Sequence, residues 1–228
     1  EDVLLGEATR LTSVILPGMP GYDENQAHYT YDPAKCEEEL KLSKWKAVEG
    51  GFEPAEDGEI SLWDTGFRLT LAYNTGNTAR QTIGQILQAE ISAINENFII
   101  EVTGLPWPNY LSNFQSRKLP ISTSGWVEDI DDPHNWVQPY MVGTFARRQS
   151  LPADLKTILQ DYIDRGVAEA DPVKRDAIYK ELNQVYYENV PTIILFVVNG
   201  RRYQQRWVEG WFTNRVFPGT YYYSMWKQ

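Results

Sequence analysis

The chain has 228 residues, 42% hydrophobic and 13% aromatic, which is typical of a folded protein with one large or two small domains. Its formal net charge of -10 argues against a nucleic-acid partner, since phosphate contacts require clustered Lys and Arg side chains. The single cysteine, Cys36, excludes an intrachain disulfide and a cysteine-based zinc site. No apolar run approaches the roughly 20 residues of a membrane span. The start, Glu1-Asp2-Val3 without a methionine, indicates a fragment or a processed product.

The first third of the chain predicts an irregular segment, a helix and a strand. Residues 1–31 are rich in Pro-Gly pairs and predict an extended segment lying across a surface. Asp32-Pro33 is a helix start, and we expect that helix to end near Trp45. Residues 50–58 predict a loop, and the alternation over residues 68–73 predicts a strand.

A βαβ unit is predicted next. The capping box Thr78-x-x-Gln81 begins a helix. One apolar face at helical spacing is formed by Ile83, Ile86, Leu87, Ile91 and Ile94. Residues 98–103 predict a second strand, which we expect to be parallel to the first. A short helix opening at Pro106-Trp107-Pro108 and a third strand over residues 119–124 follow.

The second half predicts two long helices, a strand and an aromatic tail. The helix over residues 151–168 is expected to bury Leu155, Ile158, Leu159 and Ile163. The helix opening at Asp171-Pro172 is expected to bury Ala177, Ile178, Leu182, Val185 and Tyr186. Residues 192–198 are continuously apolar and predict a buried strand. The tail predicts short extended segments that pack on something else through Tyr203, Trp207, Trp211, Phe212, Phe217, Tyr221, Tyr222, Tyr223 and Trp226.

The stretch from Ser124 to Trp136 is the candidate functional segment. It joins two tryptophans to four acids, which are Glu128, Asp129, Asp131 and Asp132. One interpretation is a solvated acidic turn whose Asp residues cap a helix starting near Pro133. The other is a ligand-binding loop, in which an aromatic face supplies contact area and a carboxylate supplies orientation. Its position after a predicted strand of an α/β sheet favours binding.

Catalytic and metal signatures are weak. Only His28 and His134 could serve a nucleophile, and the sequence has no Gly-x-Ser-x-Gly elbow and no Gly-rich phosphate loop. Glycoside hydrolysis needs two carboxylates across a bond, and acids this close in sequence cannot be assigned those roles. The aspartates lack the spacing of a calcium loop, and a lone His134 gives no zinc spacing. We therefore expect no enzyme, no metal and no cofactor.

Five segments in order carry a family resemblance. They are Tyr31-Asp32-Pro33-Ala34-Lys35-Cys36, Leu69–Tyr73 with Arg80, Gln85 and Leu87-Gln88, Trp107-x-x-Tyr110-Leu111, Gly125-Trp126-x-x-Asp129-x-x-Asp132-Pro133, and Asp171-Pro-x-Lys-Arg175 with Tyr179 and Val190-Pro191. Together they resemble the extracellular solute-binding proteins of family 5, the dipeptide- and oligopeptide-binding components of bacterial ABC importers. Cys36 stands where the family usually has Ala, and Glu128 where it often has a small or neutral residue.

The resemblance implies a fold and a site. It implies an α/β, periplasmic-binding-protein-like lobe with a mixed, mostly parallel sheet flanked by helices and an extended aromatic tail. Residues 1–198 would be the carboxy-terminal lobe, and residues 199–228 would return to a missing amino-terminal lobe. Asp129 would pair with the α-amino group of a bound peptide, and Trp126 would form pocket wall. Gly125, Val127 and Trp136 complete the expected ligand-binding set, and no Arg matches a carboxylate-binding position.

The resemblance also implies a function outside the cytoplasm. We expect capture of a peptide or oligopeptide for an ABC permease, in the periplasm or outside the cell, with lipid anchoring as one arrangement. Oligosaccharide binding stays open, since eight tryptophans could stack on sugar faces. Two other classes also stay open, a glycoside-cleaving enzyme and an adhesion module that uses the aromatic tail. The chain alone would hold half a site, so we expect it to bind weakly.

Overall fold

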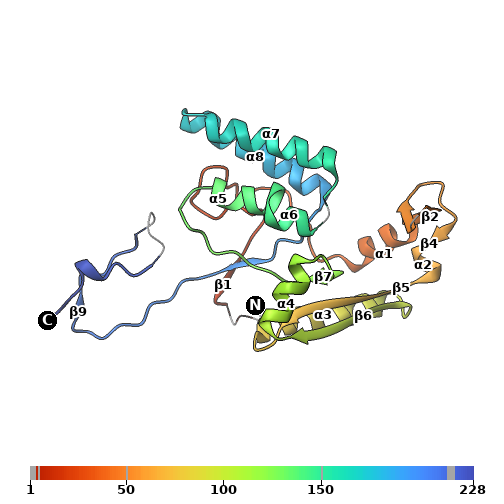
Figure 1. The fold of residues 1–228 in the computed structure, drawn as a ribbon, viewed down its shortest axis with the longest axis horizontal. Coiled ribbons are helices and arrows are strands. Elements are labelled where there is room, and N and C mark those ends of the chain that lie inside the picture. Colours follow the sequence, from red (N-terminus) through yellow and green to blue (C-terminus); the bar gives the residue numbers. More distant parts are fainter. Residues whose placement is uncertain (1–3, 5, 50, 150, 215–218) are drawn as a thin grey trace. The chain divides into compact units, whose positions relative to one another are not determined.

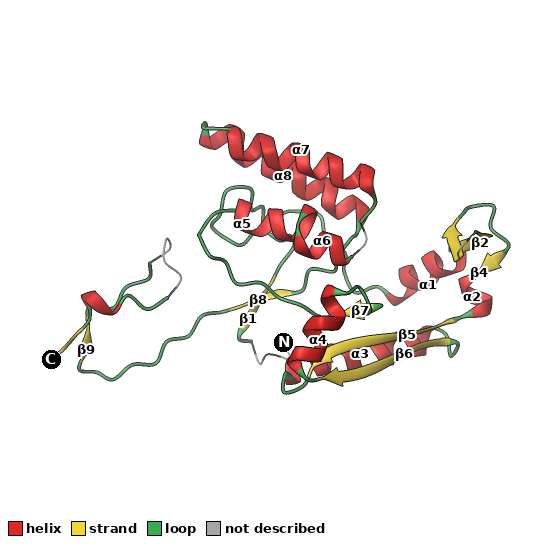
Figure 2. Cartoon of the chain, viewed as in Figure 1, coloured by secondary structure: helices red, strands yellow, loops and turns green. Residues whose placement is uncertain are grey.

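The computed structural model describes residues 4, 6–49, 51–149, 151–214 and 219–228 (Figures 1 and 2). The chain divides into two compact units. Unit 1 contains Glu1–His28 and Gly125–Gln228, and unit 2 contains Tyr29–Ser124. Each unit is described by itself. Helices and strands occur in both units, so the predicted α/β class is confirmed.

Unit 2 is built on a small parallel sheet with strand order β6-β5-β7. Strands β5 (Phe67–Asn74) and β6 (Phe98–Leu105) pair in parallel along their whole lengths, as predicted. Strand β7 (Ile121–Ser122) is shorter than the predicted third strand and lies parallel to β5 on its other side. Helix α4 (Trp107–Gln115) follows β6, as the sequence predicts.

Helix α3 (Thr78–Ile94) connects β5 to β6 and packs against both strands (Figure 2). A side-chain carbon at Gly84 would lie 2.9 Å from Cδ2 of Leu71, so a glycine lets the helix approach the sheet. The predicted capping box is wrong in position. Asn77 caps the helix by accepting a hydrogen bond from the amide of Arg80, because its carboxamide reaches the third amide of the helix. Ile86 was expected to be buried but is 47% exposed.

The start of unit 2 differs from the prediction. Helix α1 (Pro33–Leu42) begins as predicted with Asp32 as its cap, but it ends before Trp45. Trp45 lies in strand β2 (Lys44–Val48), which pairs antiparallel with β3 (Gly51–Pro54) and with β4 (Ile60–Ser61). The loop predicted over residues 50–58 is therefore partly strand β3. Ser43 takes an extended conformation at the end of α1 and leads into β2. Gly50 lies outside the described residues. Helix α2 (Leu62–Thr65) completes this part.

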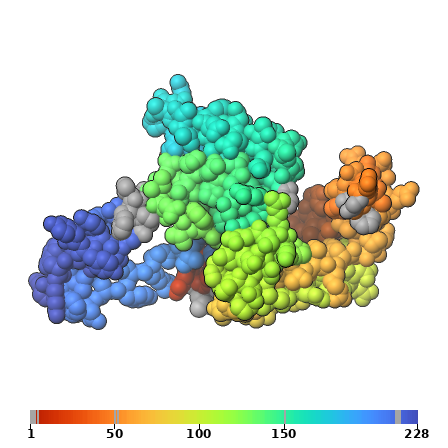
Figure 3. Space-filling model, viewed as in Figure 1, coloured from red at the N-terminus to blue at the C-terminus, as the bar shows by residue number. Residues whose placement is uncertain are grey.

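The core of unit 1 lies beneath helices α7 (Ala153–Ala168) and α8 (Pro172–Asn189), which pack side by side (Figure 1). Shorter elements complete the core. They are α5 (His134–Val137), a π-helical segment η1 (Gln138–Val142) and α6 (Thr144–Arg148). Figure 3 shows this part, coloured from green to cyan, as a closely packed surface.

The amino-terminal segment contributes to this core, contrary to the prediction of a surface segment. Val14, Ile15 and Met19 are buried among residues of α7 and α8. Gly21 fixes the segment on α8, since its amide donates to the carboxylate of Asp176 at 2.8 Å. The backbone of Gly21 has φ +85°, and a side-chain carbon there would lie only 2.3 Å from Cβ of Tyr179.

The buried faces of the two long helices differ slightly from the predictions. In α7, Leu155, Leu159 and Ile163 are buried as expected, but Ile158 is 48% exposed. In α8 the expected Ala177 is exposed. Leu182 and Tyr186 are buried as predicted, and Tyr179 and Asn183 are also buried. The ring of Tyr179 lies against Gly166 of α7 and occupies the space between the two helices.

Of the buried strand predicted over residues 192–198, only residues 196–198 form a strand, and that strand is not buried. Strand β8 (Phe196–Val198) pairs antiparallel with β1 (Ala8–Arg10), and these two strands form a ribbon without a third strand in the described residues. Val198 in β8 is 59% exposed, because a two-stranded ribbon covers neither of its own faces, and Ile193, which precedes the strand, is 74% exposed.

The tail has the predicted character of short extended segments (Figure 1). Strands β9 (Val208–Glu209) and β10 (Trp226–Lys227) pair antiparallel, and a 3₁₀ turn, η2 (Tyr222–Ser224), precedes β10. Tyr203 and Tyr223 are almost fully exposed, while Phe217 lies outside the described residues. Within the described chain, no helix is long and apolar enough to cross a membrane.

Candidate ligand-binding loop

The candidate segment lies in unit 1 as an irregular stretch that leads into α5. Gly125 is exposed and Val127 is 80% exposed, so this part of the loop faces solvent in unit 1. Trp126 is half-buried and packs against the core cluster. Its ring meets the ring of Phe145 edge to face at 6.1 Å between centroids. The indole of Trp126 therefore has one supported side and one accessible side.

Asn135 of α5 organises the loop. Its carboxamide oxygen Oδ1 accepts a hydrogen bond from the backbone amide of Asp129 at 2.9 Å. The same oxygen accepts a second bond from the indole Nε1 of Trp126 at 3.3 Å. A carbonyl oxygen has two lone pairs, so one atom satisfies both donors. This arrangement holds the two residues that the sequence singles out on one side chain.

Asp129 and Glu128 have different surroundings. Asp129 is exposed, and in the described chain its backbone is held while its carboxylate receives no hydrogen bond. Glu128 accepts a hydrogen bond from the indole Nε1 of Trp136 at 2.8 Å. Trp136 is only 9% exposed and belongs to the core cluster. The carboxylate of Asp129 is therefore available to a partner, whereas that of Glu128 already has one.

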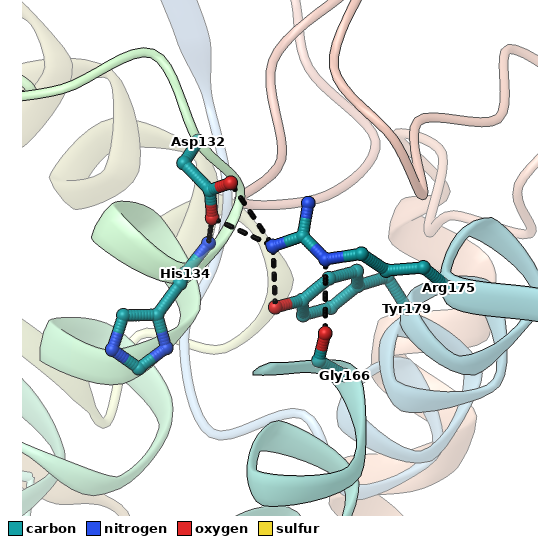
Figure 4. Close-up of polar contacts among 5 residues, drawn as sticks. All are labelled: Asp132, His134, Gly166, Arg175 and Tyr179. Carbon is teal, nitrogen blue, oxygen red and sulfur yellow. Dashed lines mark hydrogen bonds and ion pairs between the residues drawn. The ribbon is translucent and has the colours of Figure 1, made fainter. Parts of the chain in front are cut away.

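Asp132 connects the loop to the helices of unit 1 (Figure 4). Its Oδ1 accepts from the backbone amide of His134, the first residue of α5, at 2.8 Å. Nη2 of Arg175 on α8 donates to both carboxylate oxygens, at 2.9 and 3.0 Å. Nε of Arg175 donates to the carbonyl of Gly166 on α7 at 2.9 Å, and Nη2 also contacts the hydroxyl of Tyr179. One guanidinium thus joins the loop, α7 and α8.

The surroundings of Arg175 stabilise its protonated, charged form. Partial burial lowers the pKa of the guanidinium, but the hydrogen bond and charge of Asp132 outweigh it, so the pKa of Arg175 is raised above its ordinary value. Both side chains are largely shielded, with 21% of Arg175 and 32% of Asp132 exposed. An ion pair shielded to this extent is screened less by salt than a surface pair.

The loop does not gather its acids for metal binding. Asp132 faces Arg175 and Glu128 faces Trp136, so two of the four carboxylates are directed to partners within the protein. Across the residues that the structure describes, no group of three or more His, Cys, Asp or Glu side chains could hold a metal ion.

The structure brings together two of the residues that the sequence singles out. Trp126 and Asp129 lie together, with Gly125 and Val127 beside them, whereas Trp136 is a buried support for Glu128. Asn135 was not predicted. Its signal was available, because Asn residues next to turns frequently bind nearby backbone amides through their side chains.

A solved structure shares the fold of this chain. A solved ABC transporter-associated periplasmic binding protein, DppA from Helicobacter pylori in complex with the peptide STSA, matches with a TM-score of 0.69 at 19% identity. The match covers 98% of this chain and 40% of that protein. The chain therefore has the α/β fold of part of a periplasmic binding protein.

The sequence profile of the bacterial extracellular solute-binding proteins, family 5 (middle region), matches residues 1–146. The chain belongs to this family. The dipeptide-binding protein of Escherichia coli is 24% identical over 194 residues, which are 85% of this chain and 33% of that protein. The oligopeptide-binding protein OppA of Bacillus subtilis is 23% identical over 222 residues, which are 96% of this chain and 37% of that protein. The chain thus spans about a third of the length of these relatives.

Proposed function

We propose that this chain is one lobe of a two-lobed solute-binding protein that captures peptides or oligopeptides for an ABC importer. The observation that carries the proposal is the exposed Asp129, whose backbone amide is held by the same carboxamide oxygen that binds the indole of Trp126. Family membership and relatives that are named dipeptide- and oligopeptide-binding proteins support the ligand class.

The proposed chemistry is recognition of a peptide amino terminus. An α-ammonium group carries a positive charge and three N–H donors, and the carboxylate of Asp129 accepts such donors with a directional, charge-assisted bond. Trp126 supplies an adjacent aromatic wall, and the exposed Val127 and Gly125 supply contact with the peptide backbone. Trp136 would support the loop from the core by donating a hydrogen bond to Glu128. Orientation through the amino terminus leaves the peptide side chains free to vary.

The wider proposal places this loop in a closing cleft. Residues 1–198 would form the carboxy-terminal lobe, and residues 199–228 would return to an amino-terminal lobe. The two lobes would close around the peptide by a hinge motion and present it to a membrane permease. The protein would act in the periplasm or at the outer cell surface, held there by a lipid anchor where the cell needs one. It would bind its solute without chemical turnover.

A ligand panel tests the ligand class. In the two-lobed protein that carries this chain, di- to pentapeptides should raise the melting temperature further as the ligand concentration increases, because ligands that bind only the folded state stabilise it. The 228-residue chain alone should respond weakly, because it holds half a site. Stabilisation by cello- or xylo-oligosaccharides but not by peptides, or turnover of chromogenic glycosides, would contradict the proposal.

A further inference from the structure

We infer that Asn135 is a positioning residue that gives the loop its preference for a free peptide amino terminus. The inference rests on the proposed function, in which Asp129 receives the ammonium group. Asn135 itself does not touch the ligand in this account. It acts by fixing the backbone that carries the carboxylate of Asp129 and the indole of Trp126.

The geometry around Asn135 identifies the acting atom. Both of its partners, the amide of Asp129 and the Nε1 of Trp126, are N–H donors. Only the oxygen of a carboxamide can accept hydrogen bonds, so the oxygen and not the nitrogen must face the loop. The distances of 2.9 and 3.3 Å place both donors on that one atom. A shift of Asn135 would therefore move or release both recognition groups together.

Asn135 can serve as an anchor because its own position is fixed from three sides. Its backbone amide donates to the carbonyl of Asp132 at 3.0 Å. The next two residues, Trp136 and Val137, are buried in the core of unit 1. Asp132 is in turn held by Arg175, which reaches from α8. One oxygen atom of a residue in α5 therefore holds both Trp126 and Asp129.

The consequence is preorganisation. An exposed loop that is mobile before binding must be ordered when the ligand arrives, and that ordering lowers affinity. Holding the amide of Asp129 in advance fixes the backbone from which its carboxylate projects, so less of the loop has to be ordered on binding. The benefit belongs to ligands with a free ammonium group, because an N-acetylated peptide has no charged group to place there.

The test compares three variants of the two-lobed protein that carries this chain. Asn135→Leu keeps a similar volume and removes the acceptor, whereas Asn135→Asp keeps an acceptor oxygen at the same place. Asn189→Leu is the matched control, since Asn189 bonds only to the carbonyl of Val185 at the exposed end of α8. Calorimetry gives the ratio of the Kd of an N-acetylated dipeptide to that of the same dipeptide with a free amino terminus. Hydrogen exchange of the Asp129 amide is measured alongside, without ligand.

Asn135→Leu should lower the Kd ratio several-fold and speed exchange of the Asp129 amide by roughly tenfold or more. Asn135→Asp and Asn189→Leu should keep most of the wild-type ratio and protection. A role in stability alone would lower the melting temperature and leave the ratio unchanged, which would overturn the inference. If Asn135→Leu does not fold, Asn135→Ala takes its place.

The two proposals fail in different ways. Wild-type protein that binds no peptide would overturn the proposed function and this inference with it. Wild-type protein that binds peptides with a clear ratio, combined with an Asn135→Leu variant that keeps that ratio, would overturn only the role of Asn135.

Discussion

The residue that ties unit 1 together is Arg175. Its guanidinium donates to Asp132, to the carbonyl of Gly166 and to the hydroxyl of Tyr179 (Figure 4). Two separate sequence segments, Gly125–Pro133 and Asp171–Arg175, meet at this ion pair. The sequence shows these segments only as two separate motifs. In unit 1 the Arg175–Asp132 ion pair connects them.

Replacing Arg175 by Met should destabilise the protein by about 2 to 3 kcal/mol, because the shielded carboxylate of Asp132 and the carbonyl of Gly166 lose their donors. Chemical denaturation monitored by circular dichroism gives this value. Arg165→Met is the matched control, since the Arg165–Asp161 pair is 3.5 Å long and largely exposed. It should cost no more than about 0.5 kcal/mol. Equal effects of the two substitutions would refute the structural role of Arg175.

The burial of Tyr186 leads us to expect that the folded state loses stability at alkaline pH. It is 5% exposed, and burial raises its pKa to about 12. A pKa that is higher in the folded state means that the folded state holds the proton more tightly than the unfolded state, whose tyrosine has a pKa of about 10. The stabilising effect is complete below about pH 10 and is lost as the pH rises to about 12.

Denaturant titrations between pH 9 and 12 test this effect. Tyr186→Phe should flatten the alkaline fall in stability by about 2 kcal/mol, because phenylalanine has no proton to lose. Tyr203→Phe is the control, since Tyr203 is 87% exposed. An unchanged alkaline slope in Tyr186→Phe would show that another group causes the fall.

At the scale of elements, two Asp-Pro helix starts have the same local chemistry and different contexts. Asp171 accepts from the amides of Val173 and Lys174 at the start of α8, and Asp32 accepts from the amide of Lys35 at the start of α1. Helix α8 carries buried side chains, but α1 has none. The same cap therefore supports the core of one unit and only a local helix in the other.

The two caps should respond differently to substitution by alanine. Asp171→Ala should lower the stability of unit 1 by about 1 kcal/mol, which a shifted denaturation midpoint would report. Asp32→Ala should increase hydrogen exchange within α1 and leave the midpoint of unit 1 within error, because α1 frays locally. A similar midpoint shift from both substitutions would contradict the difference in context.

The elements with clear capping residues or clear hydrophobic periodicity were predicted correctly. The helix starts at Asp32 and Asp171 and the parallel pair β5–β6 follow from capping and periodicity. The hairpin β2–β3 was missed because Lys44-Trp45-Lys46-Ala47-Val48 follows a helix without a Gly or Pro to mark the change. The exposure of β8 was missed because an apolar run does not reveal how many strands will cover it.

The position of the candidate loop could be predicted from the sequence, but the hydrogen bonds that hold it could not. The exposed Asp129 and half-buried Trp126 follow from the composition of the loop and from the family resemblance. The roles of Asn135 and Trp136 depend on which atoms meet in the folded chain. No sequence spacing states that one carboxamide oxygen accepts from both an indole and an amide six residues upstream.

At the scale of the molecule, the exposed aromatic tail and the ribbon β1–β8 are the surfaces that unit 1 leaves uncovered. Ile193, Val198, Tyr203 and Tyr223 are all more than half exposed. The proposal of a second lobe gives these side chains a partner, and the matched relatives are about three times as long as this chain. The division after residue 198 stays a prediction.

The most direct test of the proposed function is calorimetric titration of the two-lobed protein and its Asp129→Asn variant with one dipeptide. The substitution keeps the size and shape of the side chain and removes the charge that we assign to the ammonium group. Loss of one charge-assisted hydrogen bond of about 1.5 to 3 kcal/mol should weaken binding by about 10- to 150-fold. Equal affinity of the wild type and the Asp129→Asn variant would contradict the assignment.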